Sequence, residues 1–390
     1  MLDPFAGTGT ALTLVAGRGD RALGIEAHPL IGGLAALKLE RPAAPATLLE
    51  AVELLRSAAE AHASRTTLVG EPEVLRRFVP AGALRDLVGW RDAVDDVEGP
   101  WREHLRWLVL GALRDQVGRS WPYPSTRRGS RGRERPVAEL VDKRAGRMVE
   151  DLVAAPRAPR ASVIRGDARC ARTWDAIDSG SVDACISSPP YLNQVSYAEI
   201  TRLELHFLGY ARTWREMNER VSSHLVASCT QQVTKARAES ARARLETHPQ
   251  LLPRLTTVAS ALTRAQRERA RGKQYDRLLW AYFGDLCEVF ENLRRVLAPG
   301  ARAAWVIGDS ALYGVYIDTP ALIGALTEEF GLEVLDDFFL RERGRKWASV
   351  GGRHGRILSE RMLVFRQRPL ASQPTLPGFT PAAPDPVAAA

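Results

Sequence analysis

Cysteine and long apolar runs are both scarce in this sequence of 390 residues, and each scarcity excludes a class of protein. The four cysteines show no CxxC or Cys/His spacing, which argues against a disulfide framework and against a structural zinc site. No apolar run reaches the length of a membrane span, and no signal peptide is visible. We therefore expect a cytoplasmic protein with no bound metal and no membrane partner.

Internal repeats are also absent, and basic residues outnumber acidic ones. Lys and Arg total 54 against 46 Asp and Glu, which gives a net charge of +8. This balance suits a polyanionic partner, although an arginine-rich surface produces the same balance without one. Hydrophobic residues make up 45% of the chain, so the protein can bury a full core.

Short β-favouring segments alternate with helical ones along most of the chain, which predicts an α/β fold. Strands are expected at 1–2, 21–25, 161–169 and 182–187, and within 283–309, 322–343 and 356–367. Their separation by helices predicts a doubly wound sheet of seven strands. The last two strands have no long helix between them, which predicts an antiparallel hairpin at the edge of the sheet.

Two polar stretches interrupt the predicted core. The core itself is expected to comprise residues 1–44, 161–210 and 276–368. Residues 45–160 are predicted to form a mainly helical insertion with a basic loop, and 211–275 a second, basic helical insertion. The tail 369–390 is rich in proline and alanine and is expected to be disordered.

The stretch "DPFAGTGT", residues 3–10, joins the first predicted strand to a helix. Gly7 and Gly9 let the backbone approach a ligand at the end of that strand, although a tight strand-to-helix turn has the same pattern. The stretch is not the three-glycine dinucleotide fingerprint, and no lysine follows as a phosphate-binding loop requires. Asp3 adds a negative charge, which suits a positively charged cofactor better than a pyrophosphate.

Two carboxylates come at the ends of the next two predicted strands. Glu26 follows the glycine turn by about twenty residues, where an acid can accept hydrogen bonds from both ribose hydroxyls. Asp167, in "RGDAR", is placed to accept from an adenine amino group. A surface carboxylate and a turn aspartate are the alternatives when each position is taken alone.

The fourth predicted strand ends in "SPPY", residues 188–191. Prolines donate no backbone hydrogen bond and fix their own φ, so the strand ends in a rigid corner whose carbonyls still accept. A hydroxyl and a fixed carbonyl can hold both protons of an NH₂ group, and Tyr191 offers a ring for stacking. The corner therefore fits an exocyclic amine on an aromatic base, although a proline-terminated strand end is the plainer alternative.

Together these segments resemble the DNA amino-methyltransferases, the N-4 cytosine/N-6 adenine methylases that use S-adenosylmethionine. "LDPFAGTGT" resembles the cofactor motif of that superfamily, "GIEAHPL" its second motif, and "SSPPYLN" its catalytic motif. "VSYAEITRLELHFLG" and "RILSERMLVFR" also resemble family sequence. The resemblance covers most core strands but neither insertion, and it implies a seven-stranded, Rossmann-like methyltransferase core.

The resemblance also implies which residues form the site. It assigns cofactor binding to Asp3, Phe5, Gly7, Gly9, Thr10, Glu26 and Asp167. It assigns the target base to the catalytic residues Ser188, Pro189, Pro190 and Tyr191. Within the family, serine before the two prolines is more usual in cytosine N-4 enzymes, which favours cytosine over adenine as the acceptor.

The mechanism implied by the resemblance is direct methyl transfer to a base swung out of double-stranded DNA. Hydrogen bonds from the amine to Ser188 and to the Pro189 carbonyl would favour a more reactive nitrogen. No covalent intermediate is needed, so Cys185 is interpreted as core packing. The alternatives are an adenine N-6 DNA methyltransferase, an RNA or protein-amide methyltransferase, and a non-catalytic DNA-binding subunit; a restriction–modification role is an expectation from the family.

Three basic segments are expected to face DNA phosphates: 119–136, 231–277 and 341–356. In the first, aromatic residues lie among the arginines, although a solvated loop would have the same composition. The DNA contacts of this loop are assigned to Arg127, Arg128, Arg131 and Arg133.

One departure from the family concerns the start of the chain, which lies two residues before Asp3. Family members usually carry a preceding segment that completes the first strand and adds to the cofactor site. We therefore expect either an upstream start or an upstream polypeptide that supplies the missing N-terminal motif; the remaining alternative is a defective remnant.

Overall fold

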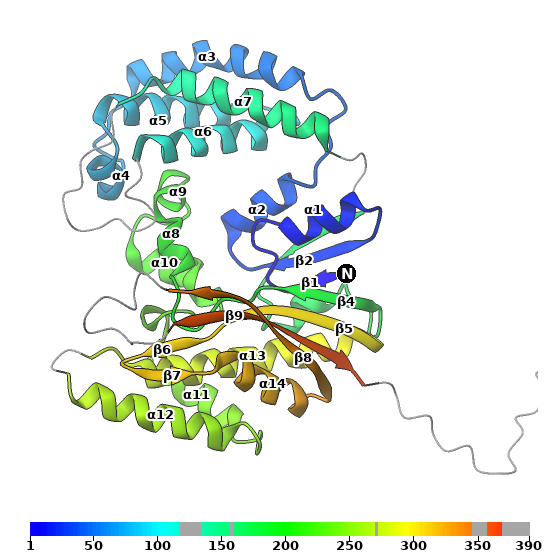
Figure 1. Ribbon diagram of the computed structural model, residues 1–390. Helices are drawn as coiled ribbons and strands as arrows, with labels where there is room; N and C mark the ends of the chain where they lie inside the picture. Colours follow the sequence, from blue (N-terminus) through cyan, green and yellow to red (C-terminus); the bar gives the residue numbers. More distant parts are fainter. Residues whose placement is uncertain (118–133, 156–159, 270–271, 345–356, 369–390) are drawn as a thin grey trace, which may run out of the picture.

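The computed structural model describes residues 1–117, 134–155, 160–269, 272–344 and 357–368 (Figure 1). Its main sheet has the strand order β3-β2-β1-β4-β5-β9-β8. These strands are β1 (Leu2–Asp3), β2 (Ala22–Glu26), β3 (Ala161–Arg165), β4 (Val182–Ser187), β5 (Leu297–Gly308), β8 (Leu332–Arg343) and β9 (Leu358–Gln367). The predicted α/β fold with a seven-stranded, Rossmann-like sheet is confirmed.

The chain direction along the sheet fixes where a ligand can bind. Strands β1 to β5 are parallel, with Leu2 of β1 paired to Leu23 on one side and to Cys185 on the other. Chain order therefore reverses at β1, and ligands of doubly wound sheets bind at the carboxyl ends beside such a switch point. The antiparallel pairing of β8 with β9 is confirmed, but β9 lies inside the sheet, between β5 and β8.

Helices cover both faces of the sheet, as a doubly wound fold requires (Figure 1). On one face lie α1 (Thr10–Gly17) and α2 (Pro29–Leu37), and on the other α13 (Tyr275–Val296) and α14 (Thr319–Glu329). The buried Phe290 ring of α13 stacks on Trp305 of β5 at 4.7 Å between centroids and meets Phe365 of β9 at 5.8 Å. These aromatic contacts form the centre of the core beneath the sheet.

The described residues of the segment 45–160 form a helical layer above α1 and α2 in Figure 1. Its described helices are α3 (Thr47–Arg65), α4 (Glu73–Phe78), α5 (Ala81–Asp95), α6 (Arg102–Val117) and α7 (Val137–Ala154). Leu48, Leu87 and Leu108 belong to a hydrophobic cluster separate from the core of the sheet. This cluster also takes in Phe207, so the layer packs against the segment that follows β4.

The segment after β4 is likewise helical, with α8 (Tyr197–Ile200), α9 (Arg202–Phe207), α10 (Trp214–Arg220), α11 (Lys235–Leu245) and α12 (Leu252–Arg267). Leu245 and Leu255 of α11 and α12 are part of the same hydrophobic core as α13. A small hairpin, β6 (Ser310–Leu312) and β7 (Val315–Ile317), follows β5 and was not predicted. Across the described ranges, none of the helices is both long and apolar enough to pass through a bilayer.

Candidate active site

A cavity of about 260 Å³ lies at the carboxyl ends of β1 to β4. This volume is close to the lower end of the range of about 300–1,000 Å³ for small-molecule pockets. Six of the residues predicted from the sequence line it: Phe5, Gly7, Glu26, Asp167, Ser188 and Pro190. Residues from separate segments therefore meet, because the ends of parallel strands lie along one edge of the sheet.

Five predicted residues lie near this cavity without lining it: Asp3, Gly9, Thr10, Pro189 and Tyr191. Gly9 has a φ of 75°, the left-handed region that favours glycine, and its backbone packs against Ala35 of α2. Thr10 is the exposed first residue of α1. The glycine turn is therefore partly a packing requirement of α1 and α2, while Gly7, with φ of 53°, faces the cavity.

The Glu26 carboxylate is fixed by two backbone donors. Gly7 N–H donates to Oε2 and His28 N–H to Oε1, both at 2.8 Å. Burial raises the pKa of the Glu26 carboxyl to about 7, and the nearby Asp3 charge adds to the rise. The glycine turn and the end of β2 are thus tied together by a carboxylate that faces the cavity.

Asp3 links the ends of β1 and β4. Its Oδ1 accepts from the Ser187 hydroxyl at 2.6 Å and from Phe5 N–H at 3.0 Å. Only 5% of Asp3 is exposed, and burial raises the pKa of its carboxyl to about 6. The Asp3 side chain therefore fixes the end of β4, which Ser188 directly follows.

In the corner after β4, residues 188–191, Ser188 is exposed whereas Tyr191 is buried. Ser188 is exposed to the cavity, and its hydroxyl donates to the Val306 carbonyl over a long 3.4 Å. Tyr191 is only 6% exposed, and the Arg343 guanidinium lies 5.2 Å from its ring centroid. One face of the Tyr191 ring is therefore already covered by a cation, and a base stacking there would have to displace Arg343.

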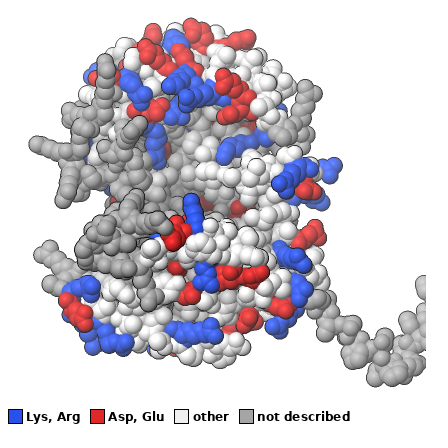
Figure 2. Space-filling view, in the orientation of Figure 1, with Lys and Arg blue, Asp and Glu red and all other residues white. Residues whose placement is uncertain are grey.

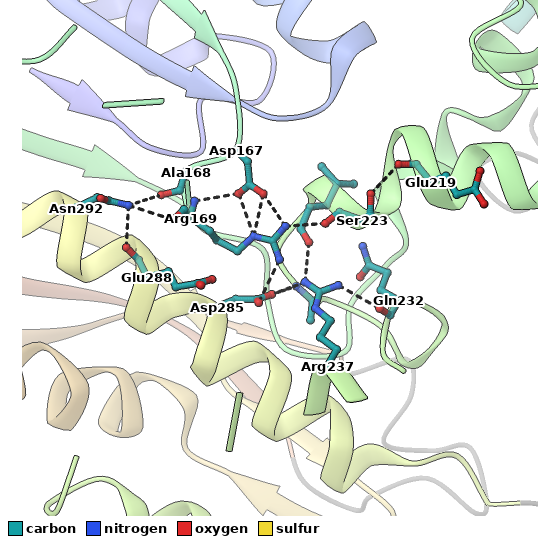
Figure 3. A network of polar contacts seen from close by, with 12 residues as sticks. Asp167, Ala168, Arg169, Glu219, Ser223, Gln232, Arg237, Asp285, Glu288 and Asn292 are labelled. Carbon is teal, nitrogen blue, oxygen red and sulfur yellow. Dashed lines mark hydrogen bonds and ion pairs between the residues drawn. The ribbon is translucent and has the colours of Figure 1, made fainter. Parts of the chain in front are cut away.

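Asp167 is bound to a basic side chain from its own loop (Figure 3). Arg169 Nη2 donates to Asp167 Oδ2 at 2.6 Å, and Nε donates to Oδ1 at 2.9 Å. The Asp167 side chain is 17% exposed and still lines the cavity. It remains available as an acceptor because each carboxylate oxygen has two lone pairs.

Sequence reasoning missed His28, which lines the same cavity and precedes α2. Its Nε2 lies 2.7 Å from Thr201 Oγ1, whose own proton goes to the Tyr197 carbonyl. Burial lowers the pKa of His28 to about 4, so the ring is neutral at pH 7. Pro29, at the first position of α2, was the available signal for a helix start with His28 as its cap.

The charge around the cavity limits its ligand. Among the described residues that line it, Glu26 and Asp167 are acidic and none is Lys or Arg. Its apolar walls include Phe5, Ile25 and Val226. This set of side chains suits a planar ring with amine or hydroxyl donors and a positive charge, and it does not suit a pyrophosphate.

Cys185 and the basic segments complete the predicted residues. Cys185 is buried beside Trp305, whose Nε1–H donates to its sulfur at 3.4 Å, which confirms its interpretation as core packing.

The predicted DNA contacts at Arg127, Arg128, Arg131 and Arg133 lie outside the described residues. On the face seen in Figure 2, basic and acidic side chains are interspersed and do not form one basic patch.

Comparison with known proteins supports the resemblance noted from the motifs. No family model matches the chain. A stretch of 206 residues is 25% identical to the type II methyltransferase M.BsoBI of Geobacillus stearothermophilus. The match takes in 50% of this chain and 40% of that relative, so it spans less than half of the relative's length. It confirms the similarity to the DNA methylase superfamily.

Solved structures add no further support. A candidate DNA modification methylase from Thermus thermophilus and its selenomethionine derivative are each 16% identical to this chain. Each superposes with a TM-score of 0.26 and covers 54% of this chain and 56% of its own.

Proposed function

We propose that this chain is an S-adenosylmethionine-dependent DNA methyltransferase that acts on the exocyclic amine of a flipped base, with cytosine N-4 as the preferred acceptor. The observation that carries the proposal is that Ser188 and Pro190 line the same cavity as Glu26 and Asp167. A base-holding corner and two carboxylates suited to a nucleoside therefore share one site. The sequence similarity to M.BsoBI supports the class of reaction.

The described residues fit S-adenosylmethionine, which supplies an electrophilic methyl group on a positively charged sulfur. Glu26 would accept from the ribose hydroxyls, and Asp167 would accept from the adenine amino group; both line the cavity. The absence of Lys and Arg among the described residues lining the cavity agrees with a cationic ligand. Phe5 would line the methionine end of the cofactor, as the resemblance implies, and Val226 adds an apolar wall to the cavity.

Ser188 and the Pro189 carbonyl would hold the acceptor amine. The Ser188 hydroxyl donates to the Val306 carbonyl over 3.4 Å, so its Oγ would act as an acceptor toward the amine. Acceptors on both amine protons stabilise the positive charge that develops on nitrogen as it attacks. Positioning beside the methyl donor supplies much of the remaining rate enhancement.

DNA binding would involve the basic segments of the chain. A net charge of +8 favours a polyanion, and the predicted arginines at 127, 128, 131 and 133 would contact phosphates. Extrusion of one base from the duplex places its amine within reach of Ser188. Serine before the two prolines is the feature that favours cytosine over adenine.

The proposal is tested by transfer of a tritiated methyl group from S-adenosylmethionine to nucleic acid by the purified chain. Because the proposed enzyme is site-specific, genomic DNA from a methylation-free host and RNA serve as parallel substrates, and the labelled base is identified after hydrolysis to nucleosides. We expect label in the cytosine of DNA, and none with the Ser188→Ala variant. Label in the adenine of DNA would move the acceptor to adenine, and label confined to RNA would overturn the proposal.

A further inference from the structure

Four charged side chains of alternating sign connect the cavity to the helices beneath it (Figure 3). In order they are Asp167 after β3, Arg169, Asp285 of α13 and Arg237 of α11. All four have side chains at most 20% exposed. Asp167 is the one that lines the cavity, so the other three act on the cavity through it or through the neighbouring backbone.

Arg169 holds Asp167 in a single orientation. Its Nη2 donates to Oδ2 at 2.6 Å, and its Nε lies 2.9 Å from Oδ1 and 3.1 Å from Oδ2. The backbone N–H of Arg169 also donates to Oδ1, at 2.9 Å. Both oxygens therefore accept from Arg169, and a ligand N–H would share one of them with the guanidinium. A carboxylate clamped in this way cannot rotate to present a different oxygen to a ligand.

Asp285 accepts hydrogen bonds both from Arg169 and from the backbone next to the cavity residues Leu225 and Val226. Its Oδ1 accepts from Arg169 Nη1 at 3.2 Å, and its Oδ2 accepts from Arg237 Nη2 at 2.7 Å. Oδ2 also accepts from Ala227 N–H at 2.8 Å, directly after the cavity residues Leu225 and Val226. The orientation of Asp167 and the position of the cavity residues Leu225 and Val226 therefore both depend on a single buried carboxylate.

The arrangement has the properties of an orienting device. Burial alone would lower the pKa of Arg169, but its bonds to Asp167 and the charge of Asp285 hold that pKa above its ordinary value. The guanidinium thus stays charged and cannot release Asp167 by losing a proton. If Asp285 lost its charge, Arg169 and Arg237 would lose the partner that they share. Arg169 would keep its bonds to Asp167 and to the Ser223 carbonyl but lose the contact that fixes its Nη1.

We propose that Arg169, Asp285 and Arg237 are positioning residues that orient the Asp167 carboxylate, so that the cavity selects a 6-aminopurine over a 6-oxopurine. The inference rests on the proposed function, because it takes the adenine of the cofactor as the group that Asp167 reads. An amino group donates to the carboxylate, whereas a 6-oxo group places an acceptor against it. Sites built around one hydrogen bond discriminate in this way.

The test is calorimetric titration of the full chain with S-adenosylhomocysteine and with its 6-oxo analogue, S-inosylhomocysteine. The measured quantity is the ratio of the two Kd values in wild type and in Asp285→Asn. Glu288→Gln is the matched control, because Glu288 pairs with Arg244 between the same two helices, α13 and α11, without touching Asp167. General loosening of the fold weakens both ligands alike and leaves the ratio unchanged.

We expect wild type and Glu288→Gln to favour S-adenosylhomocysteine by about tenfold or more, as for a hydrogen bond to a charged acceptor. Asp285→Asn should bring the ratio close to one. Thermal unfolding monitors the fold of each variant, and Arg237→Gln replaces Asp285→Asn if the latter does not fold, since Arg237 is the more exposed end of the chain of charges.

Three outcomes would overturn the inference, and they separate it from the proposed function. If Asp285→Asn and Arg237→Gln keep the wild-type ratio, the inference is wrong and the proposed function stands. Equal affinity of wild type for both ligands would mean that Asp167 does not read the amino group. If wild type binds neither ligand, the proposed cofactor is wrong, and the inference falls with it.

Discussion

Ser188 is the residue on which the proposed chemistry depends most. Removal of its hydroxyl in Ser188→Ala takes away one acceptor for the amine but leaves the carboxylates of the cavity in place. We expect single-turnover methyl transfer to fall by about 10²-fold or more, with the Kd of S-adenosylhomocysteine unchanged. Ser181→Ala is the matched control, because its exposed hydroxyl bonds only the Asp178 carbonyl at the other end of β4. Equal rates for both variants would contradict a role for Ser188.

Glu26 predicts a pH dependence of cofactor affinity. Burial raises its pKa to about 7, so the carboxyl gains a proton as the pH falls through that value. A protonated carboxyl accepts ribose hydroxyls poorly, and binding should weaken by up to about tenfold per pH unit below 7. Asp3, with a pKa raised to about 6, adds its own change only at lower pH. Titrations between about pH 6 and pH 8 should show affinity that is level near pH 8 and falls below pH 7 in wild type, with a smaller change in Glu26→Gln.

The same raised pKa has a cost for stability, and its sign can be worked out. Between about 4.5, the ordinary pKa of a glutamate, and 7, the folded protein keeps a proton on Glu26 that the unfolded chain has released. The contribution of Glu26 to the free energy of unfolding therefore declines as the pH rises through this window. Chemical denaturation of wild type and Glu26→Gln across the window measures this effect. The free energy of unfolding of wild type should fall relative to that of Glu26→Gln as the pH rises from about 4.5 to about 7.

Single residues were predictable from the sequence where the ends of strands determined their position. Glu26, Asp167 and Ser188 meet because parallel strands place their ends at one edge. The contact of the Arg343 guanidinium with the Tyr191 ring was not predictable, because Arg343 lies on β8, far from Tyr191 in the sequence. The ion pairs by which Arg169 joins Asp167 to Asp285 were not predictable either, since no local sequence pattern links β3 to α13.

Among the elements, α13 contributes most to the core beneath the site. Phe290 is fully buried between Trp305, Phe365 and Phe330. Phe290→Ala should lower the free energy of unfolding by about 3–5 kcal/mol, measured by denaturant titration. Phe339→Ala is the control, because that ring is 64% exposed on β8 and should cost little. Equal losses for both would contradict the packing described for α13.

Elements were predictable where periodicity and turn residues mark them. The strand 182–187 and the helix before β5 are both found at the positions that were predicted from the sequence. The place of β9 between β5 and β8 was not predictable, because the pattern of a strand does not name its partners. The β6–β7 hairpin was missed because its strands have only three residues each.

For the whole molecule, the net charge of +8 predicts salt-sensitive DNA binding. Plots of log K against log salt should be linear, with a slope of about −0.9 for each phosphate contacted. Replacing Arg127, Arg128, Arg131 and Arg133 by alanine together should make the slope shallower, while Ser188→Ala should leave it unchanged. Affinity that does not respond to salt, or an identical slope in the fourfold variant, would contradict this assignment of the arginines.

The most direct measurement of the proposed activity is mass spectrometry of nucleosides from the DNA of a methylation-free host that expresses this chain. The Ser188→Ala variant, expressed at the same level, is the matched control. We predict N-4-methylcytosine in the DNA of cells with the wild-type chain and none with the variant. N-6-methyladenine would keep the reaction class and contradict the choice of cytosine, and a host DNA with neither base would contradict the proposed activity of this chain.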